Sequence, residues 1–154
     1  MQLSLHADYA CRVLIYLGSV EAKLSSVEEI ARSDRISQNH LVKVAHRLAK
    51  LGFIDTVRGR RGGLRLSRDP AEIFLGQVIR QTEPGFDLVE CFDPLTNTCP
   101  IIGVCGLKAA LIRAREAFLR ELDGVTLADI LQNSHAMAVI LQELGARQTA
   151  STLR

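Results

Sequence analysis

The chain has 154 residues, of which 47% are hydrophobic and 23% charged, and its formal net charge is +2 at pH 7. This composition predicts one compact domain with appendages rather than a disordered chain. No stretch reaches the roughly 18 uninterrupted apolar residues of a membrane helix, and the chain starts with His6, Asp8 and Arg12 where a secretion signal would be apolar. We therefore expect a cytoplasmic protein with no membrane partner.

The small net charge hides a basic centre between two acidic ends. Residues 35–68 carry nine Lys and Arg against Asp55 alone. Residues 1–34 carry three basic against five acidic residues, and residues 69–154 carry seven against eleven. A basic segment between acidic ones is typical of a polyanion-binding surface built into a fold. A merely solvated cationic face is the alternative that charge alone leaves open.

Three helices are predicted in the first third of the chain. Apolar residues recur at helical spacing over 7–22. The segment 25–29 (SSVEE) is a capping sequence for a short second helix that ends near Ser33. A third, capped helix begins at Ser37, buries an apolar stripe, and stops at Gly52.

The third helix has amide, imidazole and cationic side chains near its N-terminal end. Two short helices with a tight connection, the second carrying such residues, fit a helix-turn-helix whose recognition helix enters a major groove. Asn and Gln can read adenine edges there, and Lys or Arg can read guanine. An ordinary surface helix carries similar residues, so this pattern alone leaves both interpretations open. The candidate DNA-binding residues of this segment are Ser37, Gln38, Asn39, His40, Lys43 and Arg47.

A hairpin with a cationic tip follows at residues 53–66, which we call the wing. Residues 53–57 and 64–66 favour strands, and RGRRGG at 58–63 is a turn. Glycines permit close approach to a sugar-phosphate backbone, and arginines neutralise phosphates. A nucleotide cradle is the competing interpretation, but the run lacks G-x-x-x-x-G-K-[ST]. The wing adds five candidate DNA-binding residues, which are Arg58, Arg60, Arg61, Gly62 and Gly63.

Two further helices are predicted beyond the wing, one opening at residues 71–73 and a long one over 107–122. The long helix places one apolar stripe at Leu107, Leu111, Ala114, Phe118 and Leu122. A long helix outside a small domain needs a partner, and a second copy of the chain would supply one as a homodimer. Folding back on its own domain is the alternative.

The expected fold class is mainly α with a small β-hairpin wing. We divide the chain into a winged helix-turn-helix DNA-binding domain at 1–84, a cysteine loop at 85–106, and a dimerisation helix and C-terminal helix at 107–145. A short helix starts at 126–131, and residues 146–154 are expected to form a flexible tail.

The cysteine loop (residues 85–106) contains Cys91, Cys99 and Cys105 among prolines and glycines. Such a loop lets three thiolates converge on one centre without helical spacing. Three thiolates favour a soft acceptor, namely zinc, copper(I) or an iron-sulfur cluster. Buried apolar cysteines are the alternative, and a disulfide would leave one cysteine over in a reducing compartment.

Three protein ligands do not complete an ordinary four-ligand site. A fourth ligand has to come from elsewhere in the chain, or the position stays open and reactive. The candidates are His6, Asp8, Cys11 and His135. Of these, Cys11 is predicted to be a core residue of the first helix.

Several segments together resemble the NsrR family of iron-sulfur transcriptional repressors, within a wider group that includes RirA and IscR. The likeness covers roughly residues 1–131 and depends on the order of its elements rather than on any single one. It is carried by the start at 1–9, the segment SQNHLVK at 37–43, the turn VRGRRGG at 57–63, the three cysteines, and LDGVTLAD at 122–129.

The resemblance implies a homodimeric winged-helix repressor that binds double-stranded DNA and holds a cluster through Cys91, Cys99 and Cys105. [4Fe-4S] is the favoured form and [2Fe-2S] the alternative. Asp8, reaching across from the other subunit, is the implied fourth ligand. The implied signal is nitric oxide, which displaces Asp8 and lifts repression of nitric oxide detoxification genes.

One feature of the cysteine loop argues against the IscR branch of the group, and another keeps the RirA branch open. Gly106, Leu107 and Lys108 follow the last cysteine, where an IscR-like site has a histidine. The seven-residue gap between Cys91 and Cys99 is similar to RirA, which makes an iron-responsive repressor of iron-uptake genes the alternative function.

Two other classes of protein compete with a regulator. A cysteine-based enzyme with Cys91 or Cys105 as nucleophile needs an activating base, and the sequence places none nearby. A zinc-stabilised module that binds protein would leave the arginines of the wing unexplained. We therefore predict a regulator and no enzyme.

Overall fold

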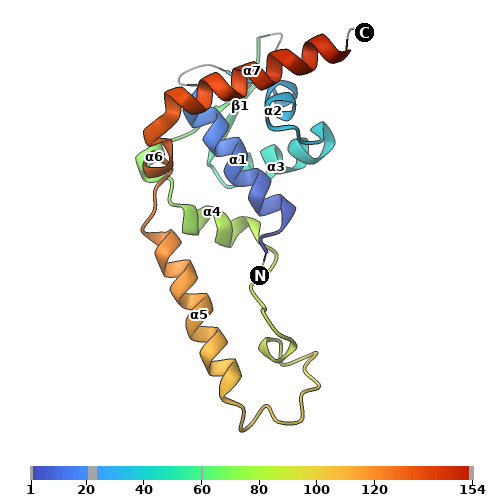
Figure 1. The fold of residues 1–154 in the computed structure, drawn as a ribbon, viewed down its shortest axis with the longest axis vertical. Helices are drawn as coiled ribbons and strands as arrows, with labels where there is room; N and C mark the ends of the chain where they lie inside the picture. Colours follow the sequence, from blue (N-terminus) through green and yellow to red (C-terminus); the bar gives the residue numbers. More distant parts are fainter. Residues whose placement is uncertain (1, 21–23, 60, 153–154) are drawn as a thin grey trace.

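The computed structural model describes residues 2–20, 24–59 and 61–152, with side chains described through residue 146. Helices dominate this part of the chain, and two strands form one antiparallel hairpin (Figure 1). In chain order the elements are α1 (Leu5–Ser19), α2 (Val27–Asp34), α3 (Gln38–Lys50), β1 (Ile54–Val57), β2 (Gly63–Leu66), the 3-10 turn η1 (Pro70–Glu72), α4 (Leu75–Thr82), η2 (Glu90–Phe92), α5 (Gly106–Asp123), α6 (Leu127–Ile130), η3 (Leu131–Asn133) and α7 (Ser134–Thr152).

Side-chain caps start α1, α2 and α6, whereas α3, α4 and α5 begin without one. At α2, Ser26 Oγ accepts from the backbone N–H of Glu29 at 3.1 Å, and Glu29 accepts in return from the N–H of Ser26 at 2.7 Å. This reciprocal pair confirms the predicted capping box. At α3 the prediction is wrong in detail, because Ser37 holds the N-cap position but its side chain makes no capping hydrogen bond.

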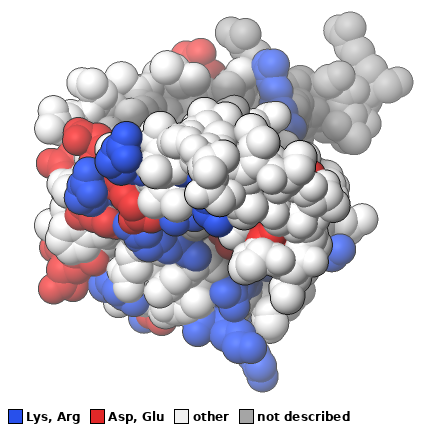
Figure 2. All heavy atoms as spheres, turned by 90° about the horizontal axis from the view of Figure 1, so that it is seen from below, with Lys and Arg blue, Asp and Glu red and all other residues white. Residues whose placement is uncertain are grey.

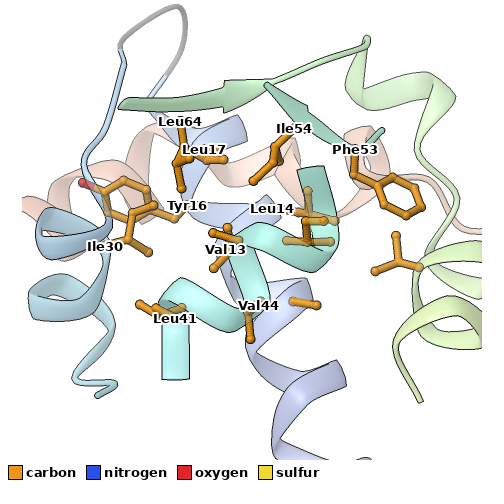
Figure 3. Packing of buried hydrophobic residues seen from close by; sticks show 14 of the residues in the cluster. Val13, Leu14, Tyr16, Leu17, Ile30, Leu41, Val44, Phe53, Ile54 and Leu64 are labelled. Atoms are coloured by element: carbon orange, nitrogen blue, oxygen red, sulfur yellow. The ribbon is translucent and has the colours of Figure 1, made fainter. Parts of the chain in front are cut away.

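The hydrophobic core lies around α1, which passes through the middle of the N-terminal domain (Figure 3). Val13 and Leu14 of α1 are almost completely buried, and α2 and α3 pack on the same helix. Phe53, at the start of the wing, is fully buried against them. Burying such side chains contributes about 1.5–3 kcal/mol each, so this cluster holds α2, α3 and the base of the wing against α1.

The wing is an antiparallel hairpin attached to the core at its base. Ile54 pairs with Leu66 and Val57 with Gly63. Leu64 also exchanges two backbone hydrogen bonds with Ser25, of 2.8 and 3.1 Å. This isolated bridge at Ser25 holds the wing beside the start of α2. The arrangement is that of a winged helix-turn-helix.

The predicted fourth helix is divided in two. Its opening residues form η1, Ile73 and Phe74 are extended, and α4 begins only at Leu75. The interruption has a physical cause, because Ile73 and Phe74 bind the segment after α5. The Ile73 carbonyl accepts from Leu127 N–H at 2.8 Å, and Phe74 forms an isolated bridge with Thr126.

Helix α5 leaves the winged domain, and the cysteine loop lies at its far end (Figure 1). Leu119 is its one buried residue. The predicted apolar stripe is therefore not buried in the single chain: Leu107, at 58%, and Ala114 are exposed, and its other three residues are partly buried. The sequence left open that α5 folds back on its own domain. It does so only at its C-terminal end, near Asp123, which packs on α4.

Helix α7 corrects the expectation of a flexible tail from residue 146. It lies across α1 and α2 (Figure 1) and continues to Thr152, while residues 153 and 154 lie outside the described part. Leu141 packs against the core, and Ser19 Oγ lies 3.9 Å from Met137 Sδ. The residues after Gly145 include good helix formers such as Ala146, so the helix does not end at that glycine. Within the described residues, no helix is long and apolar enough to cross a membrane.

Candidate DNA interface and cysteine site

Helix α3 separates a buried face from a polar one. Leu41, Val44, Ala45 and Leu48 are buried, because helical spacing places them on one side, toward α1. The six residues predicted from sequence to contact DNA are all exposed, namely Ser37, Gln38, Asn39, His40, Lys43 and Arg47. The geometry needed for a recognition helix is therefore present.

Two of these side chains also have partners inside the protein. The Arg47 guanidinium donates to the carbonyl oxygen of Gln81, at the end of α4, over 2.9 Å. The His40 ring lies 6.3 Å from that of Tyr9 on α1, centroid to centroid. These contacts tie the exposed face of α3 to α4 and to the start of α1.

The basic segment found by counting charges divides into two kinds of cation. Arg58 and Arg61 at the tip of the wing are exposed, and Arg60 lies outside the described residues. Arg65, by contrast, pairs with Asp55 across the hairpin at 3.2 Å. Arg68 donates to the Gly52 carbonyl at 2.8 Å and lies over the Phe53 ring, 5.1 Å from its centroid. Counting alone could not distinguish these arginines, which have partners within the hairpin and its base, from those at the tip.

Gly62 and Gly63 are required by the hairpin itself. A Cβ on Gly62 would lie 2.1 Å from the Val57 carbonyl oxygen, and one on Gly63 about 3.0 Å from the Ser25 backbone. Packing therefore excludes a side chain at Gly62 and leaves very little room for one at Gly63. Close approach to a phosphate backbone, the reason proposed from sequence, stays a prediction.

The three cysteines of the cysteine loop line one cavity of about 220 Å³. Cys91 lies in η2, and Cys105 occupies the N-cap position of α5. All three thiols are free and partly buried, and Ile101 and Ile102 line the same cavity. Since the positive end of a helix dipole favours negative charge, the start of α5 suits a site built from thiolates.

Side-chain hydrogen bonds shape the loop around this cavity. Asp93 accepts from the backbone N–H of Leu95 at 2.8 Å, and Glu90 accepts from the Thr98 hydroxyl at 3.1 Å. The N–H of Cys99 donates to the Asn97 side-chain oxygen at 3.2 Å. These turns bring Cys99 back toward η2 without a regular element.

None of the four candidates for a fourth ligand lies among the residues that line this cavity. Asp8 on α1 is half exposed and lies 3.8 Å from the Arg12 guanidinium. His6 lines a separate pocket with Tyr9 and His40, and His135 is exposed on α7. Among the described residues, no group of three His, Cys, Asp or Glu side chains could hold a metal ion.

Cys11 is a core residue, as its position in the first helix predicted. Its side chain packs against the buried cluster. Burial, and secondarily the charge of Asp8, raises the pKa of the Cys11 thiol to about 11. A protonated thiol at neutral pH is a poor metal ligand.

The end of the molecule that carries the cysteine loop has an uneven surface. Viewed from below (Figure 2), a broad uncharged area covers the upper centre of this face, and most charged side chains lie around it. The most exposed apolar residues of the loop are Leu95 at 93% and Val104 at 90%.

Residues 3–133 match the sequence model of Rrf2, described as an iron-dependent transcriptional regulator. The chain belongs to the Rrf2 family. Among curated relatives, the transcriptional regulators named NsrR from Geobacillus kaustophilus and Halalkalibacterium halodurans are 46% and 47% identical to it. Each match covers 92–93% of this chain and 98% of the relative. These matches confirm the resemblance to NsrR, and they show a transcriptional regulator rather than an enzyme.

Solved structures of Rrf2-like regulators confirm the fold class. CymR, the global cysteine regulator of B. subtilis, superposes with a TM-score of 0.67 at 26% identity, over 84% of this chain and 95% of that one. IscR from T. potens gives 0.68 at 23% identity, over 87% and 88%. The predicted fold class, mainly helical with a small β-hairpin wing, is therefore confirmed.

Proposed function

We propose that this Rrf2-family chain is a homodimeric transcriptional repressor that binds operator DNA and senses nitric oxide through an iron-sulfur cluster. The observation that carries the proposal is the cavity lined by Cys91, Cys99 and Cys105 at the start of α5. It lies in a chain whose other end is a winged helix-turn-helix. Sensing and DNA binding are thus assigned to two sites joined by α5 and α4.

DNA binding rests on α3 and the wing. The exposed polar residues at the start of α3 enter the major groove and read base edges, and Arg58 and Arg61 neutralise phosphates beside it. Arg60 belongs to the same turn by sequence. Phosphate contacts of this kind make the affinity fall with salt.

A homodimer is supported by the surface of α5. Leu107 is 58% exposed, Ala110 and Ala114 are exposed, and Leu119 alone is buried along the whole helix. A second copy packed along α5 would cover this apolar surface. It would also present two recognition helices to the two half-sites of a symmetric operator.

The residues at the cavity fit an iron-sulfur cluster by their donor chemistry. Three free thiols would supply the soft anionic ligands that such clusters take, and the partner subunit's Asp8 would complete the set as a weaker carboxylate ligand. A cluster is larger than a single ion and is held around a space, which suits cysteines that line one cavity. Bound there, it would supply iron that reacts with nitric oxide.

Helix α1 would transmit the change at the cluster to the recognition helix. Asp8 lies one turn before Arg12, and the Arg12 guanidinium hydrogen-bonds Asp34 at 3.1 Å, at the end of α2. Release of Asp8 from its ligand position would loosen this start of α1. Since α3 packs on α1, the spacing of the two recognition helices would change, and repression of detoxification genes would be lifted.

An iron-responsive repressor is the second candidate function. The description of the family as iron-dependent and the seven-residue gap between Cys91 and Cys99 favour it. In that case loss of iron from the same thiols, rather than reaction with nitric oxide, releases DNA.

The experiment that tests the proposal is analysis of iron and acid-labile sulfide, with an ultraviolet-visible spectrum, on protein purified without oxygen. A brown protein whose spectrum bleaches with a few equivalents of nitric oxide supports the nitric oxide sensor. A colourless protein that binds zinc contradicts the cluster. A cluster that is inert to nitric oxide but lost to an iron chelator supports the iron-responsive function.

A further inference from the structure

Val42 is an apolar side chain on the exposed face of the recognition helix. It is 50% exposed and lies on the flank of α3, beside the buried face that contacts the core through Leu41, Val44, Ala45 and Leu48. A half-exposed valine contributes little to folding. Packing within the chain therefore gives no reason for an apolar residue at this position.

The neighbours of Val42 are residues suited to reading bases. Helical geometry places Val42 one turn after Gln38 and Asn39 and one turn before His46, and all three are exposed. Val42 lies in the N-terminal half of α3, the part of a recognition helix that contacts base edges. A groove that receives Asn39 would bring its neighbour Val42 close to the base edges on that side of α3.

We infer that Val42 is a specificity-determining residue that contacts the C5-methyl group of a thymine in each half-site. The inference rests on the proposed DNA-binding function. In the major groove, thymine alone among the four bases presents a methyl group, and apolar side chains are its partners. A phosphate or a hydrogen-bonding edge offers nothing to an isopropyl group, so the thymine methyl is the complementary partner there.

The size of the effect follows from one methyl group. Burial of a single methyl or methylene changes affinity about fourfold, so a dimer that contacts two half-sites loses about fifteenfold when both methyls are removed. The loss is independent of salt, because no phosphate is involved.

The test begins with selection of tight-binding sequences from a random duplex library by the full-length protein, purified without oxygen. The selected duplex is then made with deoxyuridine in place of thymine at each position in turn, which removes only the methyl group. Affinities are measured for the wild type and Val42→Ala. Val139→Ala serves as the matched control, because Val139 is 43% exposed on α7, far along the chain from α3.

We expect one thymine per half-site whose replacement weakens wild-type binding about fourfold. At that position Val42→Ala should show a clearly smaller difference between thymine and deoxyuridine than the wild type, because the shorter side chain loses most of the contact, and Val139→Ala should keep the wild-type ratio. An unchanged ratio in Val42→Ala would overturn the inference while leaving DNA binding intact. If the wild type enriches no duplex at all, the proposed function fails, and the inference fails with it.

Discussion

Gly76 of α4 and Asp123 at the end of α5 lie in direct backbone contact. A Cβ added to Gly76 would lie 2.0 Å from Asp123 Oδ1 and 2.8 Å from its backbone nitrogen. Asp123 also accepts from Arg80, one turn further along α4, at 2.7 Å. This hydrogen bond lowers the pKa of the Asp123 carboxyl. The joint between the winged domain and α5 is therefore fixed by a close approach that only glycine permits.

Gly76→Ala should destabilise the protein, although alanine is the better helix former. The new Cβ meets backbone atoms of Asp123, which cannot move away as a flexible side chain would. We expect the free energy of unfolding in urea to fall by about 1–3 kcal/mol, as for other overpacked sites. Gly85→Ala is the control, because an added Cβ there meets nothing within 4 Å. Equal stability of the two variants would contradict the assigned contact.

Replacement of the loop cysteines should separate cluster ligands from the core thiol. Cys91→Ser, Cys99→Ser and Cys105→Ser should each lower iron and sulfide per chain and abolish the visible absorption. Cys11→Ser should retain both, because Cys11 packs against the core. Iron and sulfide analysis after purification without oxygen gives the readout. Retention of a normal cluster by any loop variant would remove that cysteine from the ligand set.

Exposed arginines of the wing should act through phosphates. Arg58→Ala and Arg61→Ala should weaken binding to all duplexes to a similar degree. Each should also reduce the slope of log affinity against log salt by about one unit per lost phosphate contact. Arg65→Ala is the comparison, because Arg65 is already paired with Asp55 at 3.2 Å. A salt slope that changes more in Arg65→Ala than in Arg58→Ala would contradict this assignment.

The Cys11 thiol should make stability depend on pH in the alkaline range. Its pKa rises from 9.0 to about 11 on folding, so the folded state binds the proton more tightly than the unfolded state. The stabilisation is fully present below pH 9 and is lost as pH rises toward 11. Urea unfolding at pH 8 and pH 10.5 should show a decline that is smaller in Cys11→Ser than in wild type by roughly 1–2 kcal/mol. Parallel curves for the two proteins would show that folding does not raise the pKa of the Cys11 thiol.

The sequence predicted the winged domain well because its signals are local. The capping box at Ser26 and Glu29 and the glycine-rich turn of the wing determine structure over a few residues. The break before α4 was missed, because Ile73 and Phe74 form bonds with residues more than 50 positions away. Such pairings leave no periodic pattern in the sequence.

At the candidate site, too, the sequence predicted local features and missed those that depend on distant partners. Three cysteines in one loop predicted a shared site, and they line one cavity. Arg65 and Arg68 have partners elsewhere in the fold, Asp55 and the Gly52 carbonyl, so a count of charges includes them with the cations that are free to contact DNA. Helix α7 was expected to be shorter, because its apolar and polar residues do not separate onto two faces.

The most direct test of the proposed repressor is DNA affinity of the protein purified without oxygen, measured before and after nitric oxide on a duplex selected from a random library. We expect tight binding beforehand and at least a tenfold loss of affinity after a few equivalents of nitric oxide, with recovery once the cluster is rebuilt. Unchanged affinity, in a preparation whose cluster absorption has bleached, would contradict the link between the cysteine site and the recognition helices.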